Sequence, residues 1–428
     1  MLVRSVRALL EDQPCAEGDA ENKGCSNEAW VAGRIALIDS SADATASPAC
    51  DRMLRAVLEH DGARVTLTCE RLDARDVKLG TWVRARGRLL EGVFEAELVE
   101  VLHEPEREPT AASSDAVWGQ RGGIAMLHQR SAALGAVRGW LAGEGFIEVE
   151  TPLAVRSPGL EVHLSALEVT GAGERRYLHT SPEYHMKRLL AAGASRIYSL
   201  GKVFRQEELG ARHEPEFTML EWYRAFGDGA AMMRDTEELA AHVARALLGT
   251  TVVPGVSGRG PIELAPPWQR LTVREAFERY AGVSADSLVD DEEQFFHVLA
   301  TRVEPELGRG KPTILMRYPA RFAALARLCD DDPTVAERFE AYVDGVELCN
   351  AFDELTDARE QRTRLLADQA TRRSAGKPPY PIDERFLEAL ETGLPPCSGN
   401  ALGFDRLLML ILGQARIEDV IPFGHSRT

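Results

Sequence analysis

The segment EFTMLEWYRAF, residues 216–226, restricts the possible folds of this chain more than any other stretch. Alternate side chains of a strand point to opposite faces. One face would carry Phe217, Met219, Glu221 and Tyr223, and the other Thr218, Leu220 and Trp222. Both faces are largely apolar, which predicts a central strand, where a carboxylate is unfavourable unless a cation accompanies it. Glu221 therefore indicates either a structural pair with Arg205 or Arg224 or a binding site for an amine.

Long helices and strands alternate from about residue 120 onward. Ser181 and Gly193 are suited to begin and end one helix, and Asp344-Gly345 is a favoured hairpin turn. Strand pairs joined by tight turns, with helices in runs, predict the α+β class with a mainly antiparallel sheet flanked by helices. The predicted helices lie near 128–145, 180–193 and 356–376, the predicted strands near 146–152, 197–205, 216–226, 337–343 and 346–355, and a strand end runs into a buried helix within 399–413.

A different pattern precedes this region. Short runs rich in Val, Ile, Leu and Thr, with one helical crossing near residues 50–60, predict a five-stranded OB-like barrel. The preceding residues are expected to form a short helix and then a disordered piece, and a Pro- and Ser-rich charged segment follows the barrel. The predicted parts are an extension at 1–25, the barrel at 26–104, a linker at 105–119 and a catalytic domain at 120–428.

Composition excludes several classes of protein. No long apolar run or signal peptide is present, so we expect neither a membrane span nor export. The seven cysteines include no C-x-x-C pair, which favours reduced thiols in the cytoplasm over disulfides or a zinc site. The net charge is −17, and residues 1–110 hold 14 Lys and Arg against 21 Asp and Glu. Such charge opposes nucleic-acid binding and is compatible with a basic protein partner.

Five carboxylates fall on or beside what would be one sheet. Oxygen ligands suit Mg²⁺, which takes only one or two protein carboxylates besides substrate phosphates, so the others need different cations. A diamino acid would supply them. Each Glu alone fits a surface position, and Glu183 also fits a helix N-terminus; the clustering favours a site. The five are Glu183, Glu221, Glu340, Glu347 and Glu354, with Asn350 and Phe352 on the same hairpin face.

Cationic and small residues lie near these carboxylates. Arg205 ends a strand and suits an α-phosphate, Arg406 suits the outer phosphates, and Phe217 could stack on a base. His213 lies in the polar loop between the two strands. The small residues Gly399, Ala401 and Gly403 would let a ligand approach the backbone, although close packing of helix on sheet explains them equally. Walker A, G-x-G-x-x-G, G-x-S-x-G and H-E-x-x-H motifs are absent from the sequence.

Three segments together resemble the motifs of class II aminoacyl-tRNA synthetases. GFIEVETPL resembles motif 1, KVFRQEELGARHEPEFTMLEWY motif 2 and GNALGFDRLLML motif 3, and SPEYHMKRLL with GVELCNAFDELTDAREQ is similar to the lysine group. The resemblance implies ATP and Mg²⁺ as cofactors, a homodimer through motif 1, and a role for each matching residue. Implied contacts are Arg205 with the α-phosphate and substrate carboxylate, Glu207, His213, Phe217, Gly403 and Arg406 with ATP, Glu340 and Glu347 with Mg²⁺, and Glu183, Glu221, Tyr223, Asn350, Phe352, Glu354 and Ala401 with lysine.

Two branches of the lysine group fit. One charges tRNA with lysine, and the other contains paralogous ligases that attach (R)-β-lysine or lysine to elongation factor P. Position 401 holds Ala, as in the ligases, whereas the synthetases carry Gly there. The alternative interpretation is a Gly-to-Ala exchange that affects packing alone and is functionally neutral. The acidic barrel also argues against tRNA. We therefore expect the ligase; a lysyl-tRNA synthetase and an inactive paralogue acting as a binding module remain alternatives. Two features depart from the family pattern. Gln206, Glu214 and Ala351 replace the usual motif residues, and the barrel is absent from the ligases, which consist of a catalytic domain alone.

Overall fold

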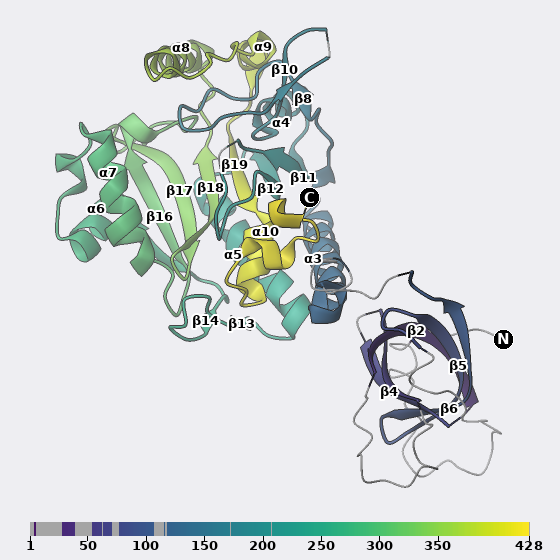
Figure 1. The fold of residues 1–428 in the computed structure, drawn as a ribbon. Coiled ribbons are helices and arrows are strands. Elements are labelled where there is room, and N and C mark those ends of the chain that lie inside the picture. The colour runs from purple at the N-terminus through teal and green to yellow at the C-terminus, as the bar shows by residue number, and fades with distance from the viewer. Residues whose placement is uncertain are drawn as a thin grey trace. The chain divides into compact units, whose positions relative to one another are not determined.

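The computed structural model describes residues 4–5, 28–38, 54–61, 63–70, 77–106, 115, 118–171, 173–206 and 208–427. The chain divides into two compact units, Met1–Gln129 and Arg130–Thr428 (Figure 1). The fold class is confirmed, because the first unit contains a small β-barrel and the second a large, mainly antiparallel sheet with helices. The predicted boundaries at residues 26, 104 and 120 stay predictions, since most of 105–119 and nearly all of 1–25 lie outside the described residues.

The barrel of the first unit closes because β2 pairs with both β3 and β5, in the order β2-β3-β4-β6-β5. Alternate side chains, such as Leu54 and Leu58 on one strand and Val83 on another, fill its interior with no exposed surface. The five-stranded OB-like prediction is therefore confirmed. Its strands are β2 Glu28–Ile38, β3 Leu54–His60, β4 Ala63–Cys69, β5 Trp82–Leu90 and β6 Val93–His103.

Two local predictions in this unit were wrong. Residues 54–60 form strand β3 and not a helix, because pairing with β2 and β4 satisfies the backbone while Leu54, Ala56 and Leu58 face the core. Arg4–Ser5, expected in a helix, forms β1, which pairs in parallel with β2 at Val31 and Ala32. The pairing of β2 with β3 begins only at Arg34, so the edge of β2 at Val31 and Ala32 is available for β1. Other residues of the predicted extension lie outside the described part of the chain.

The second unit is built on an eight-stranded sheet in the order β15-β16-β17-β18-β19-β12-β11-β7. The strand predicted to be central, β12, lies between β11 and β19, and only the β15–β16 and β7–β11 pairs are parallel. The strands are β7 Ile147–Glu148, β11 Arg196–Phe204, β12 Glu216–Ala225, β15 Gln269–Thr272, β16 Thr313–Pro319, β17 Val335–Val343, β18 Val346–Asp353 and β19 Cys397–Gly403. Smaller pairs and triplets are β8 Ala154–Val155, β9 Glu168–Val169 and β10 Arg176–Leu178, and β13 Val252–Val253 with β14 Ile262–Glu263.

Helices cover this sheet, and their ends follow local chemistry. Asp228 caps α5 by accepting from the Ala231 amide at 2.8 Å, and Asp357 caps α8 in the same way. The predicted turn residues Asp344 and Gly345 have φ of 51° and 72°, as the β17–β18 hairpin requires. The helices are α3 Ile124–Gly143, α4 Glu183–Ala191, α5 Gly229–Leu248, α6 Val273–Ala276, α7 Glu292–Val298, α8 Ala358–Ser374, α9 Glu384–Gly393 and α10 Phe404–Ile411.

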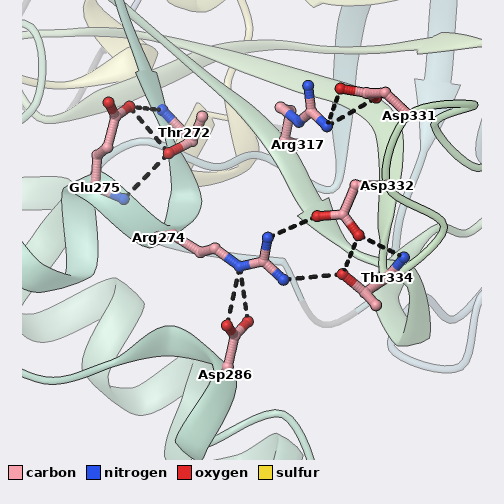
Figure 2. A network of polar contacts seen from close by, with 8 residues as sticks. All are labelled: Thr272, Arg274, Glu275, Asp286, Arg317, Asp331, Asp332 and Thr334. Atoms are coloured by element: carbon pink, nitrogen blue, oxygen red, sulfur yellow. Dashed lines mark hydrogen bonds and ion pairs between the residues drawn. The ribbon is translucent and has the colours of Figure 1, made fainter.

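Between β15 and β16 the chain makes a helical excursion, residues 273–306, that contains α6 and α7 beside one edge of the sheet (Figure 1). Arg274 fastens it, because its guanidinium contacts Asp286 at 2.9 Å, Asp332 at 2.8 Å and Thr334 at 2.9 Å (Figure 2). Thr272 and Glu275 form a capping box at the start of α6. The excursion is thereby fixed to the loop before β17.

The described residues include no helix of the length and apolar character needed to cross a membrane. Cys69, Cys329, Cys349 and Cys397 are free and buried.

Candidate functional site

A cavity of about 810 Å³ opens on the face of the large sheet that carries Phe217 and Met219. Strands β12, β17, β18 and β19 form its floor, and α4, α8 and the excursion contribute to its walls. The predicted site residues on its wall are Glu183, Arg205, His213, Phe217, Glu340, Glu347, Asn350, Phe352, Ala401, Gly403 and Arg406. Three others, Glu221, Tyr223 and Glu354, are buried and do not line the cavity, and Glu207 lies outside the described residues.

One end of the cavity is cationic. The Arg205 guanidinium lies 5.2 Å from the Phe217 ring centroid, and its buried Nε has no hydrogen-bond partner among the described residues. Arg406 Nη2 lies 2.7 Å from Nε2 of His213, and burial together with this arginine lowers the pKa of the imidazole. A neutral imidazole beside two guanidiniums is suited to an anionic ligand, and an unpartnered buried N–H indicates a missing acceptor.

Arg406 is positioned by a brace that the sequence did not reveal. Its neighbour Asp405, fully buried, accepts from Arg130 Nη1 at 2.6 Å and from the Thr218 amide at 2.7 Å. Arg130 also donates to the carbonyl of Val420 at 3.0 Å. The brace ties the first turn of α10 to α3 and β12, so Arg406 is held on rigid elements.

Two carboxylates approach this cationic end. Glu340 Oε2 accepts from Tyr318 and Tyr342 at 2.6 Å each, and Oε1 accepts from Arg338 at 2.6 Å. Glu347 lies 3.3 Å from Arg406, and burial and the like charge of Glu340 raise the pKa of its carboxyl. The described residues contain no group of three or more metal-ligating side chains. Two carboxylates fit Mg²⁺ if substrate phosphates supply further oxygens, and a divalent cation would relieve the repulsion between them.

The middle of the floor carries polar side chains on one side and the small side chain of Ala401 on the other. Arg338 donates to Asn350 Oδ1 at 3.3 Å and stacks over Tyr318, with its Cζ 4.4 Å from the ring centroid. Ala401 of β19 pairs with Glu221 on one side and Asn350 on the other, so its methyl group lies between the two predicted recognition strands. The position of Ala401 on the wall agrees with a role in substrate shape.

Lys187, which the sequence analysis did not consider, is buried next to Glu183, which lines the cavity. Its Nζ contacts Glu183 at 2.6 Å and Glu354 at 2.5 Å, and its side chain is fully buried. Burial alone would lower the pKa of Lys187, but the two carboxylates outweigh burial and raise it. Glu354 is thus neutralised by the protein itself, and Glu183 is shared between Lys187 and the cavity. The i,i+4 spacing of Glu183 and Lys187 in α4 was the available sequence signal.

Glu221 has no cationic partner among the described residues. Its Oε2 accepts from the Ser181 hydroxyl at 2.8 Å and its Oε1 from the Tyr223 hydroxyl at 2.7 Å. Both alternatives for a structural pair were therefore wrong, since Arg224 binds Asp235 at 2.5 Å and Arg205 approaches Glu208. Burial and the nearby Glu183 raise the pKa of Glu221 to about 8. Ser181, which lines the cavity, connects this carboxyl to the ligand space.

Each of the three residues that differ from the usual motif residues has a defined structural contact. The Gln206 amide donates to Ser165 at 2.7 Å, Glu214 accepts from the His425 amide at 2.9 Å, and Ala351 is fully buried in the main core. The motif 2 loop is consequently held against Ser165 on one side and His425 on the other. Altogether, guanidinium groups at one end, two carboxylates beside them and a buried group of carboxylates are arranged along one cavity.

Comparison with known proteins agrees with this arrangement. A family model described as tRNA synthetases class II (D, K and N) matches residues 122–427. A Salmonella gallinarum protein named elongation factor P--(R)-beta-lysine ligase is 41% identical over 323 residues, which are 74% of this chain and 99% of that protein. A Proteus mirabilis protein of the same name is 41% identical over 340 residues, covering 73% of this chain and 98% of that protein.

Proposed function

The chain belongs to the class II tRNA synthetases of the Asp, Lys and Asn type, and from this premise we propose that it activates (R)-β-lysine or lysine with ATP and transfers it to a lysine of elongation factor P. The relatives named as such ligases supply the acceptor and the amino acid. The observation in the structure that supports the chemistry best is Arg205, whose buried Nε has no hydrogen-bond partner within the described part of the chain and lies at the cationic end of the cavity.

The first step makes an adenylate. The substrate carboxylate attacks the α-phosphorus of ATP, and pyrophosphate leaves with the electrons of the broken P–O bond. Arg205 is assigned to the α-phosphate and the substrate carboxylate, and Arg406 with His213 to the outer phosphates, because donors aimed at developing charge stabilise the transition state. Phe217 is assigned to the adenine face, with Gly403 beside the nucleotide and Glu207 as a further contact.

Mg²⁺ is assigned to Glu340 and Glu347. Bound there, it would neutralise phosphate charge. Three donors, Arg338, Tyr318 and Tyr342, fix the orientation of the Glu340 carboxylate.

Recognition of the amino acid is assigned to the buried carboxylate end. Glu221 is the carboxylate left for the distal ammonium of the substrate, with Ser181 and Tyr223 orienting it, because Glu354 is already paired with Lys187. Glu183, Asn350, Phe352 and Ala401 are assigned to the wall around the substrate. A substrate without the second amine offers no ammonium to pair with the Glu221 carboxylate and therefore forgoes this contact, which gives selectivity.

The test of this function is acceptor labelling. The protein is incubated with ATP, Mg²⁺ and labelled (R)-β-lysine or lysine, with elongation factor P in one reaction and tRNA in another. We expect label on elongation factor P and none on tRNA.

Two alternative functions have their own readouts in this test. The β-barrel of the first unit is the observation that favours a lysyl-tRNA synthetase, and label on tRNA would establish it. Absence of pyrophosphate exchange with either amino acid would instead identify a binding module. A homodimer through motif 1, residues 145–153, and a cytoplasmic location complete the proposal. Ile147 and Leu153 of this segment are 63% and 46% exposed, and sedimentation tests the dimer.

A further inference from the structure

The cavity extends beyond the residues assigned to ATP and the amino acid. Its outer part, here called the mouth, is formed by His163, Glu292 and Phe296, which meet across it, and by Asp368 and Thr371 of α8. Glu292 and Phe296 belong to α7 of the helical excursion; Oε1 of Glu292 lies 3.0 Å from Nε2 of His163. His163 and Thr371 are exposed, so the mouth connects the cavity with solvent.

Glu161 stands between the mouth and the inner site and has no role in adenylate formation. It lines the cavity, half-buried, and among the described residues no other side chain bonds to its carboxylate. Gly159 makes room for this group: a Cβ there would lie 2.5 Å from Oε2 of Glu161, and φ at Gly159 is +111°. The backbone therefore accommodates a carboxylate at this point.

The main chain of Glu161 is fixed. Fully buried Arg372 of α8 donates through Nη1 to the carbonyls of Glu161 and Leu164, both at 2.7 Å. The Glu161 segment and the mouth residues Asp368 and Thr371 thus belong to one rigid body. A base held on such a body has the fixed position that proton transfer requires.

The second step needs a base. The acceptor is a primary ammonium with a pKa near 10.4, so only about one molecule in 2,500 is a free amine at pH 7. We propose that the mouth admits the acceptor ammonium and that Glu161 takes one proton from it before it attacks the adenylate, a role that rests on the function proposed above.

In this step the ammonium gives a proton to Glu161, and the nitrogen lone pair forms a C–N bond with the adenylate carbonyl carbon. The bond between that carbon and the phosphate oxygen breaks, with its electron pair leaving on AMP. The second proton on nitrogen passes to solvent, as does the proton held by Glu161. The products are an amide, AMP and two protons, and no further reactant is required.

The electrostatic surroundings suit this role. Burial and the like charge of Glu183 raise the pKa of Glu161 to about 7, while Arg205 opposes them, and burial raises the pKa of Asp368 to about 6. A base with a pKa near the working pH is the most effective one. The charged or titratable groups around Glu161 are Glu183 and Tyr184 of α4, Arg205, Asp368 and Arg372 of α8, and, across a small adjoining cavity, His179 and His185.

The experiment compares the two steps in the full-length protein and Glu161→Gln. Pyrophosphate exchange reports step one, and single-turnover transfer from the preformed adenylate to elongation factor P and to n-butylamine reports step two. We expect exchange within about threefold of wild type and transfer slower by at least about 100-fold, the usual contribution of a general base. The wild-type transfer rate should rise through pH 7, where Glu161 ionises, and the variant should lose that inflection.

Two further measurements separate a base from a structural role. Hydroxylamine is uncharged at neutral pH and needs no base, so Glu161→Gln should react with it at nearly the wild-type rate. Glu161→Asp should keep the inflection and recover part of the rate. Glu238→Gln, the same charge change at an exposed position of α5, is the matched control.

Each result has one meaning. Transfer at the wild-type rate in Glu161→Gln, a parallel loss of exchange and transfer, or an equal loss with hydroxylamine would overturn the proposal. If wild type acylates n-butylamine but not elongation factor P, the proposed function fails, and the n-butylamine comparison still decides the role of Glu161.

Discussion

Lys187 changes how the carboxylates of the pocket are understood. The sequence shows five glutamates and suggests that a diamino acid neutralises those not bound to metal, but the folded chain places its own ammonium between Glu183 and Glu354. No periodicity in the sequence distinguishes a buried lysine from a solvated one on the same helix, and the contact with Glu354 joins residues 167 positions apart. Long-range pairs of this kind are the part of the site that sequence reasoning misses.

Replacing Lys187 with Met should destabilise the protein by about 3–5 kcal/mol, because two buried carboxylates lose their counter-charge. The measurement is chemical denaturation of the second unit at neutral pH. The control is Lys202→Met, whose pair with Glu216 is 3.4 Å long and largely exposed, and which should cost less than about 1 kcal/mol. Equal effects of the two substitutions would contradict the buried network.

Glu221 predicts a pH dependence of amino-acid binding. With its pKa raised to about 8, the carboxyl of the empty site holds a proton at neutral pH, and binding an ammonium must expel it. Affinity for lysine should therefore rise with pH, by up to about tenfold per pH unit, and level off above pH 8. Equilibrium dialysis from pH 6 to 9 measures this slope.

Glu221→Gln is the matched comparison for this slope, because the titration of the free amino acid is the same for both proteins. The variant should bind lysine more weakly and with a flatter profile. An unchanged slope would show that another group releases the proton.

At the scale of elements, local chemistry determined most of the second unit. The two-sided apolar strand β12, the Asp344-Gly345 turn and helix α8 each form where the sequence predicts them. The helix predicted near residues 50–60 was wrong because the short apolar run at 54–60 fits a helix and a strand equally. Pairing with β2 and β4 selects the strand. Predictions from pattern held where turn or cap residues fixed the register.

The brace on α10 is testable at this scale. Arg130→Met leaves the buried Asp405 without its cation, so α10 should loosen and KM for ATP should rise by about 10–100-fold, as when a group that orients a ligand contact is lost. Lysine binding should change by less than about threefold, since among the described residues neither Glu221 nor Ser181 bonds to Arg130 or Asp405.

Arg138→Met is the control on the same helix. Arg138 pairs with Glu148 at 3.1 Å, with both side chains substantially exposed, and the substitution should leave KM for ATP unchanged. A similar rise in both variants would mean that α3 as a whole, and not the contact with Asp405, supports the site.

At the scale of the molecule, the comparison with known proteins covers the second unit and not the barrel of the first. The family model covers residues 122–427, and the ligases from Salmonella gallinarum and Proteus mirabilis are matched almost end to end by about three quarters of this chain. The barrel lies outside the family match. Its acidic composition was visible in the sequence, but composition does not identify a ligand.

Removing residues 1–114 should therefore leave pyrophosphate exchange within about threefold of the full chain, because all described residues of the cavity lie in Arg130–Thr428. Single-turnover transfer to elongation factor P, measured alongside, reports whether the barrel assists the acceptor. Loss of exchange on truncation would show that the first unit supports the catalytic fold directly.

The mouth of the cavity and its floor come from different parts of the chain. The central strands carry the residues assigned to ATP and the amino acid, whereas His163, Glu292 and Phe296 stand on a loop and on an excursion fastened at its own base by Arg274. Among the described residues, neither Glu292 nor Phe296 of α7 bonds to a residue assigned to ATP, so substitutions at these two positions can change the entrance alone. Such a division lets one ancestral activation chemistry acquire new acceptors, since selection can reshape the entrance while the strands beneath it stay the same.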